Sequence, residues 1–153
     1  MLKNQKGSIV FLACIFAAVI VIVFSLALEW YRAFSLAGSI EADIYRAMKT
    51  SMDMSILDGY RIDGLSVMDC DNAKRILEAY FCDNMGLNSE KVYLSNGKEI
   101  YRLNMIKMDF CGTPPSIYIE GTAEMTPMIF DAFSFKINID ISKKLQNVRL
   151  EGS

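Results

Sequence analysis

The side chains best suited to covalent chemistry are three cysteines between residues 70 and 111, Cys70, Cys82 and Cys111. The sequence contains no histidine, which excludes a histidine general base, a Ser-His triad and histidine-ligated zinc. It also contains no GxSxG, P-loop or GxGxxG motif. We therefore predict that the protein is not an enzyme and has no catalytic residue, no cofactor and no small-molecule substrate.

Acidic residues are spread over predicted turns and helix surfaces. The segment DGYRIDG contains Asp58 and Asp63, each followed by a glycine. A calcium loop needs a denser set of oxygen ligands than this segment offers, so we interpret both Asp-Gly pairs as solvated turns and predict no metal site. The formal net charge is −2, which argues against the clustered basic surface of a nucleic-acid-binding protein.

An uncharged apolar run at residues 8–28 determines how the rest of the chain is placed relative to a membrane. As a helix it would be about 30 Å long, which matches the hydrocarbon core of a bilayer. A cleaved secretory signal is the alternative, but its apolar region is usually about 7–15 residues long. Here the run is longer than that and ends only at residue 28, where Glu29, Trp30 and Tyr31 follow. We predict a single transmembrane helix in contact with membrane lipid.

The residues that flank the run predict its orientation. Lys3 and Lys6 precede it, and no acidic residue lies among residues 1–28. The positive-inside rule places the N-terminus in the cytoplasm and Trp30 and Tyr31 at the opposite interface. We therefore expect a single-pass membrane protein whose C-terminal domain is extracytoplasmic, and at the cell surface if the chain joins a filament.

The helix is expected to continue past the run, because residues 32–56 contain no proline and only one glycine. Small and apolar residues recur there at alternating intervals of three and four, which is one helical face. They are Ala37, Ile40, Ile44, Ala47, Ser51 and Met54. The domain's own sheet and neighbouring subunits are both candidates to cover this face.

The predicted parts are a basic head (1–7), a transmembrane helix (8–28), its amphipathic continuation (29–56) and an extracytoplasmic domain (57–153).

The remaining sequence predicts an α+β domain. Residues 71–85 have the spacing of a short helix, with Asp69 or Asp71 as its N-cap. From residue 91 the period becomes two, and Asn96-Gly97 marks a hairpin between strands at 91–95 and 99–110. Residues 116–125 and 133–142 alternate apolar with polar side chains, which is typical of an antiparallel sheet covered on one side. The expected fold is a long N-terminal helix packed on a four-stranded antiparallel meander.

The second strand, residues 99–110, does not keep a single alternation. Tyr101, Leu103 and Met105 share one face, whereas Ile106, Met108 and Phe110 would fall on the other. A β-bulge or a strong twist near residue 105 would bring both sets to the same face.

The three outer thiols permit one disulfide, which an extracytoplasmic domain can retain. A helix between Cys70 and Cys82 would hold their Cα atoms about 18 Å apart, whereas bridged Cα atoms are about 4.4–6.8 Å apart. Any bridge must therefore use Cys111. If the first strand runs back along the short helix and the second returns, Cys111 reaches the helix end that carries Cys82. We predict a Cys82–Cys111 disulfide, with Cys70–Cys111 and three reduced thiols as the alternatives.

The layout of the whole chain resembles a type IV pilin. The head KGSIVFLACIF, the segment DNAKRILEAYFCDNMGL and the strands around TPMIFDAF are most similar to TadE-type minor pilins (pseudopilins) of tight-adherence pilus systems. The resemblance implies that a prepilin peptidase cuts after Gly7, so that Ser8 becomes the new N-terminus. These pilins usually carry Glu five residues after the cut, where this chain has Leu12.

The resemblance also implies a function. It indicates a structural subunit of a tight-adherence or type IV-like pilus or secretion filament, with other pilin-like subunits as partners. The alternative is a membrane-anchored extracytoplasmic adaptor or binding domain that does not polymerise.

We predict a partner contact at an apolar segment between the last two strands, with packing into the domain's own core as the alternative. The segment consists of Pro127, Met128, Ile129 and Phe130.

Overall fold

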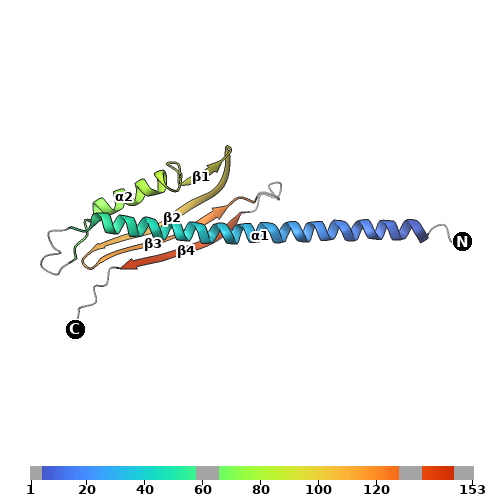
Figure 1. Ribbon diagram of the computed structural model, residues 1–153, viewed down its shortest axis with the longest axis horizontal. Coiled ribbons are helices and arrows are strands. Elements are labelled where there is room, and N and C mark those ends of the chain that lie inside the picture. Colours follow the sequence, from blue (N-terminus) through green and yellow to red (C-terminus); the bar gives the residue numbers. More distant parts are fainter. Residues whose placement is uncertain (1–4, 58–65, 128–135, 147–153) are drawn as a thin grey trace, which may run out of the picture.

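The computed structural model describes residues 5–57, 66–127 and 136–146, with side chains from residue 9 onward. Two helices and four strands follow one another along these residues (Figure 1). The expected α+β fold is confirmed, because a long helix packs on a four-stranded antiparallel sheet. In chain order the elements are α1 (Gln5–Ser55), α2 (Cys70–Asp83), β1 (Val92–Ser95), β2 (Lys98–Gly112), β3 (Pro115–Met125) and β4 (Ile137–Gln146).

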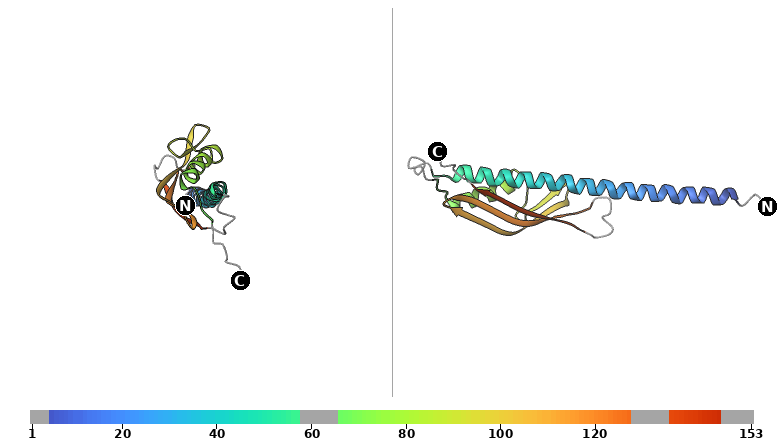
Figure 2. Two further views of the ribbon diagram at one scale, coloured as in Figure 1. Left: turned by 90° about the vertical axis from the view of Figure 1, so that its left-hand side faces the viewer. Right: turned by 90° about the horizontal axis from the view of Figure 1, so that it is seen from below.

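α1 is one uninterrupted helix of 51 residues, as expected from a segment that contains no proline. At roughly 1.5 Å per residue it is about 75 Å long. Its N-terminal half projects beyond the rest of the molecule, and its C-terminal half lies along the sheet (Figures 1 and 2). The large apolar side chains of residues 9–28 are therefore exposed on all sides of the helix.

One face of the C-terminal half of α1 is buried. Ile40, Ile44 and Ala47 lie on it as expected, each at most 2% exposed. The expected stripe was wrong at its last position, because Met54 is 65% exposed. Met52 is buried instead, since α2 packs against this end of α1.

α2 is capped by Asp69, whose carboxylate accepts hydrogen bonds from the N–H groups of Asp71 and Asn72. This N-cap satisfies two backbone donors that the helix leaves unpaired. The Ser51 hydroxyl of α1 donates a hydrogen bond to the Ala73 carbonyl oxygen, so the two helices are joined at a contact between small residues. The buried residues of α2 are Ala73, Leu77 and Phe81.

The strand order is β1-β2-β3-β4, and every neighbouring pair is antiparallel. The first hairpin turns at Asn96 and Gly97, whose φ angles are 52° and 75°. A type I′ turn requires positive φ at both positions, which explains the Asn-Gly pair. α1 and α2 cover one face of the sheet and leave the other face open (Figure 2).

β2 contains the expected bulge. Its register with β3 shifts between Met105 and Lys107. Ile106 was wrongly expected to share a face with Met108 and Phe110, because it is the bulged residue and is 70% exposed. Opposite the bulge, an ideal Cβ on Gly121 would lie 2.5 Å from the Asn104 carbonyl oxygen, so no side chain fits there. Beyond the bulge, the apolar residues of β2 return to the covered face.

β4 is the sheet edge beside α1. Alternation predicted a strand at residues 133–142, whereas β4 comprises Ile137–Gln146 and residues 133–135 lie outside the described residues. A 2.6 Å ion pair between Lys143 Nζ and Glu41 Oε2 joins the strand to α1. β4 is therefore held against α1.

Candidate functional site

The predicted processing residues, Gly7 and Ser8, lie in the first turns of α1. Leu12, at the position where the resembled pilins carry Glu, is 57% exposed. In the part of the chain that the structure describes, one helix is long and apolar enough to cross a membrane. Cleavage after Gly7 stays a prediction.

All four cysteines, including Cys82, are free thiols. The fold brings Cys111 close to Cys70. The Met68 N–H donates to the Gly112 carbonyl oxygen at 3.0 Å, and an ideal Cβ on Gly112 would lie 3.6 Å from Cys70 Sγ. Burial raises the pKa of the Cys70 thiol, and the nearby Cys111 raises it further.

The expected approach of Cys111 to Cys82 must therefore be corrected. β1 does not run back along α2; it continues in the direction of the helix before β2 returns (Figure 1). β2 is thus antiparallel to α2, and its last residues reach the N-terminal end of the helix. Cys82 lies about 18 Å along α2 from Cys70 by helical rise, so Cys70 is the thiol near Cys111.

The predicted contact segment begins at Pro127, which is buried. Met128, Ile129 and Phe130 lie outside the described residues, so the structure describes only the start of the segment. The contact prediction therefore stays a prediction.

A charged pair ties the end of β3 to α1. Arg32 Nη1 donates to Glu29 Oε1 at 2.7 Å, and the Glu29 side chain is only 6% exposed. The same nitrogen donates to the Thr126 carbonyl oxygen at 3.3 Å. A buried charge is retained only where it is paired, so this contact fixes the level at which the domain meets the apolar half of α1.

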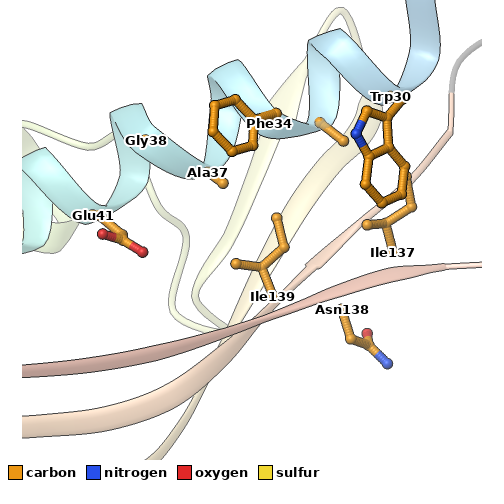
Figure 3. Close-up of a pocket in the computed structure, with 9 residues that line it drawn as sticks. Trp30, Phe34, Ala37, Gly38, Glu41, Ile137, Asn138 and Ile139 are labelled. Carbon is orange, nitrogen blue, oxygen red and sulfur yellow. The ribbon is translucent and has the colours of Figure 1, made fainter. Parts of the chain in front are cut away.

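A groove of about 370 Å³ lies between α1 and β4. Trp30 and Phe34 stand on the helix side and Ile137 and Ile139 on the strand side, while Asn138 points away (Figure 3). Trp30 and Phe34 are 73% and 74% exposed. The other lining residues are Ala33, Ala37, Gly38 and Glu41.

From the sequence we expected Trp30 at a membrane interface and did not expect it to line a groove. Its helix wall has a signal in the sequence, because Trp30, Phe34 and Ala37 recur at helical spacing on a face other than the buried one. Its strand wall belongs to a segment far along the chain, so no local pattern joins the two.

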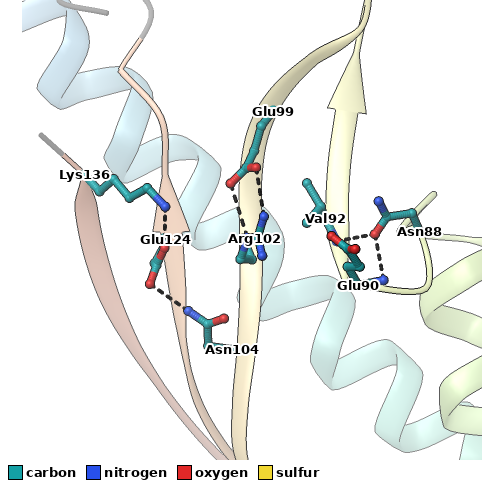
Figure 4. A network of polar contacts seen from close by, with 8 residues as sticks. All are labelled: Asn88, Glu90, Val92, Glu99, Arg102, Asn104, Glu124 and Lys136. Carbon is teal, nitrogen blue, oxygen red and sulfur yellow. Dashed lines mark hydrogen bonds and ion pairs between the residues drawn. The ribbon is translucent and has the colours of Figure 1, made fainter. Parts of the chain in front are cut away.

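The uncovered face of the sheet carries paired charges (Figure 4). Lys136 Nζ and Asn104 Nδ2 each donate to Glu124 at 2.8 Å, and the bond from Lys136 is the main cause that lowers the pKa of Glu124. Arg102 Nη2 donates to Glu99 at 3.2 Å, which raises the pKa of Arg102. Each of these two cations is thus paired with a glutamate, as is common on a solvated surface.

The functional features of the described residues are surfaces of α1 and of the sheet. Within these residues, no three His, Cys, Asp or Glu side chains are grouped so that they could hold a metal ion. The fold defines an α+β protein with a long, half-exposed N-terminal helix. Compared with protein-family models, curated proteins and solved structures, the chain matches none.

Proposed function

We propose that the protein is a membrane-anchored, pilin-like structural subunit of a pilus or secretion filament, with residues 8–28 in the membrane and the α+β domain outside the cytoplasm. The observation that carries this proposal is α1. Its first half is apolar and exposed on all sides, and the same helix continues unbroken along the sheet. Apolar surface of this extent requires cover by lipid or by other helices.

A second face of α1 supports assembly with other subunits. Its residues recur at alternating intervals of four and three on a side of α1 that the sheet does not cover, and all are exposed. Gly38 lies at its border with the groove. This spacing forms a seam along a helix, and small residues at its centre let a neighbouring helix approach closely. An ideal Cβ on Gly38 would meet no atom within 4 Å. The seam consists of Tyr31, Ser35, Gly38, Ala42 and Tyr45.

The mass of the mature N-terminus tests the processing step. In cells that contain a prepilin peptidase, the protein should lose residues 1–7 and begin at Ser8. Gly7→Val should block this loss, whereas Gly38→Ala, a glycine change within the same helix, should not. An intact head in peptidase-containing cells would count against the pilin-like proposal.

Photo-crosslinking in membranes tests assembly. A benzophenone amino acid at Ala42, in the seam, should give covalent dimers. The same probe at Ser142, exposed on the open face of the sheet, should give far fewer and serves as the matched control.

The alternative is an anchored adaptor or binding domain that does not polymerise. Leu12 favours it, because an exposed apolar side chain stands where the resembled pilins carry Glu. For this alternative we expect an intact head and only monomers from the Ala42 crosslinker. The two measurements therefore separate the candidates.

A further inference from the structure

The groove between α1 and β4 has one end nearer the apolar half of α1. Trp30 and Phe34 from the helix and Ile137 from the strand form this end (Figure 3). At the opposite end, Glu41 pairs with Lys143 at 2.6 Å, which holds helix and strand together. This ion pair therefore closes the groove at the end away from the apolar half.

The groove continues an apolar strip on the same face of α1. At about 3.6 residues per turn, Val19, Val23 and Leu26 lie on the face that carries Trp30 and Phe34. These three side chains are 51%, 59% and 50% exposed. The charged residues that follow the apolar run lie on other faces of α1 until the far end of the groove. This face therefore stays uncharged for about three turns longer than the run itself.

This strip is longer than the hydrocarbon core of a bilayer is thick. Residues 9–37 span about 43 Å as a helix, whereas a hydrocarbon core is about 30 Å thick and a bilayer with its headgroup regions about 40–45 Å. With residues 8–28 in the core, helical rise places Trp30 about 3 Å and Phe34 about 9 Å beyond the core edge, so Trp30 lies within the headgroup layer next to the domain and Phe34 just beyond its outer boundary. Ile137 lies at the same level, because it forms the opposite wall of the groove.

We propose that lipid of the leaflet next to the domain fills the end of the groove formed by Trp30, Phe34 and Ile137. Lipid contact would then seat the edge strand β4 on the bilayer, so that the domain touches the membrane through its sheet as well as through its helix. This inference rests on the proposed membrane anchor. Lipid is favoured over a second copy of α1, because a straight helix in the groove would meet the Glu41–Lys143 pair.

Fluorescence quenching tests the proposal, because Trp30 is the sole tryptophan. The full chain is reconstituted into phosphatidylcholine vesicles whose acyl chains carry bromine near the headgroup. Two variants move the probe within the groove, Trp30→Phe with Phe34→Trp and Trp30→Phe with Ile137→Trp. The control, Trp30→Phe with Met54→Trp, puts the probe at an exposed site at the far end of α1. Circular dichroism on each variant verifies the fold.

The groove probes should lose most of their emission in brominated vesicles, and the Met54→Trp control should lose almost none. Failure of the protein to float with vesicles would overturn the anchor itself. Quenching of Trp30 without quenching at positions 34 and 137 would overturn only the lipid-filled groove. The probes at positions 34 and 137 could instead show no quenching by bromine but an emission that changes with the protein-to-lipid ratio. That result would indicate that a second copy of the chain fills the groove, and it would overturn the proposal.

Discussion

The buried phenol of Tyr101 should make the stability of the fold depend on pH. Its ring stacks on that of Tyr93 with centroids 5.3 Å apart, and the side chain is 6% exposed. Burial, with smaller contributions from Asp43 and Tyr93, raises the pKa of Tyr101 to about 12. The folded state therefore favours the neutral phenol more strongly than the unfolded state does.

We expect this tyrosine to make the domain less stable in alkali. Because the pKa is raised on folding, the contribution is complete below about pH 10 and is lost as the pH rises toward about 12. Tyr101→Phe should flatten this part of the pH dependence, and Tyr45→Phe, at an exposed tyrosine, should not. Urea unfolding of the full chain in detergent micelles measures both. Identical alkaline slopes for Tyr101→Phe and the unmodified protein would contradict the assignment.

Two serines one turn apart on α1 should respond differently to removal of their hydroxyls. Ser51 donates to the Ala73 carbonyl oxygen, whereas the buried Ser55 hydroxyl has no hydrogen-bond partner among the described residues. Ser51→Ala should cost about 0.5–1.5 kcal/mol of unfolding free energy. Ser55→Ala should be neutral or stabilising, because it removes a buried polar group that makes no bond. Equal losses in chemical denaturation would show that the Ser51 bond contributes nothing specific.

At the scale of elements, the bulge in β2 sets which residues of the strand are buried. It requires close approach of the β2 backbone to Gly121, so Gly121→Ala should push the two strands apart. We expect a loss of about 1–3 kcal/mol, as for other overpacked positions. Gly38→Ala, on an open face of α1, should instead stabilise the monomer by about 1 kcal/mol. Thermal or urea unfolding in micelles compares the two, and a neutral Gly121→Ala would refute the steric argument.

At the scale of the whole molecule, the proposed topology assigns the native cysteines to different compartments. Cys82 and Cys111 are exposed on the folded domain, and Cys14 lies within the apolar half of α1. A membrane-impermeant maleimide added to spheroplasts should label Cys82 and Cys111 and leave Cys14 unlabelled. Labelling of all four thiols in denaturing detergent is the control. Modification of Cys82 and Cys111 only after lysis would reverse the orientation.

Much of this architecture could be predicted from local sequence, because a helix and a strand each impose a period on neighbouring residues. The uncharged run at 8–28 and the absence of proline after it predicted one long helix. Asn96-Gly97 predicted the first hairpin, since few residue pairs accept two positive φ angles. Even the bulge was visible, because the apolar residues of β2 change parity after Met105.

The way in which these elements lie against one another depends on packing between distant parts of the chain. The direction of β1 relative to α2 placed Cys111 near Cys70, and packing by α2 buried Met52 in place of Met54. The groove likewise joins Trp30 and Phe34 to a strand from the end of the chain. These placements depend on which surfaces exclude water together, and residues far apart in sequence make that choice jointly.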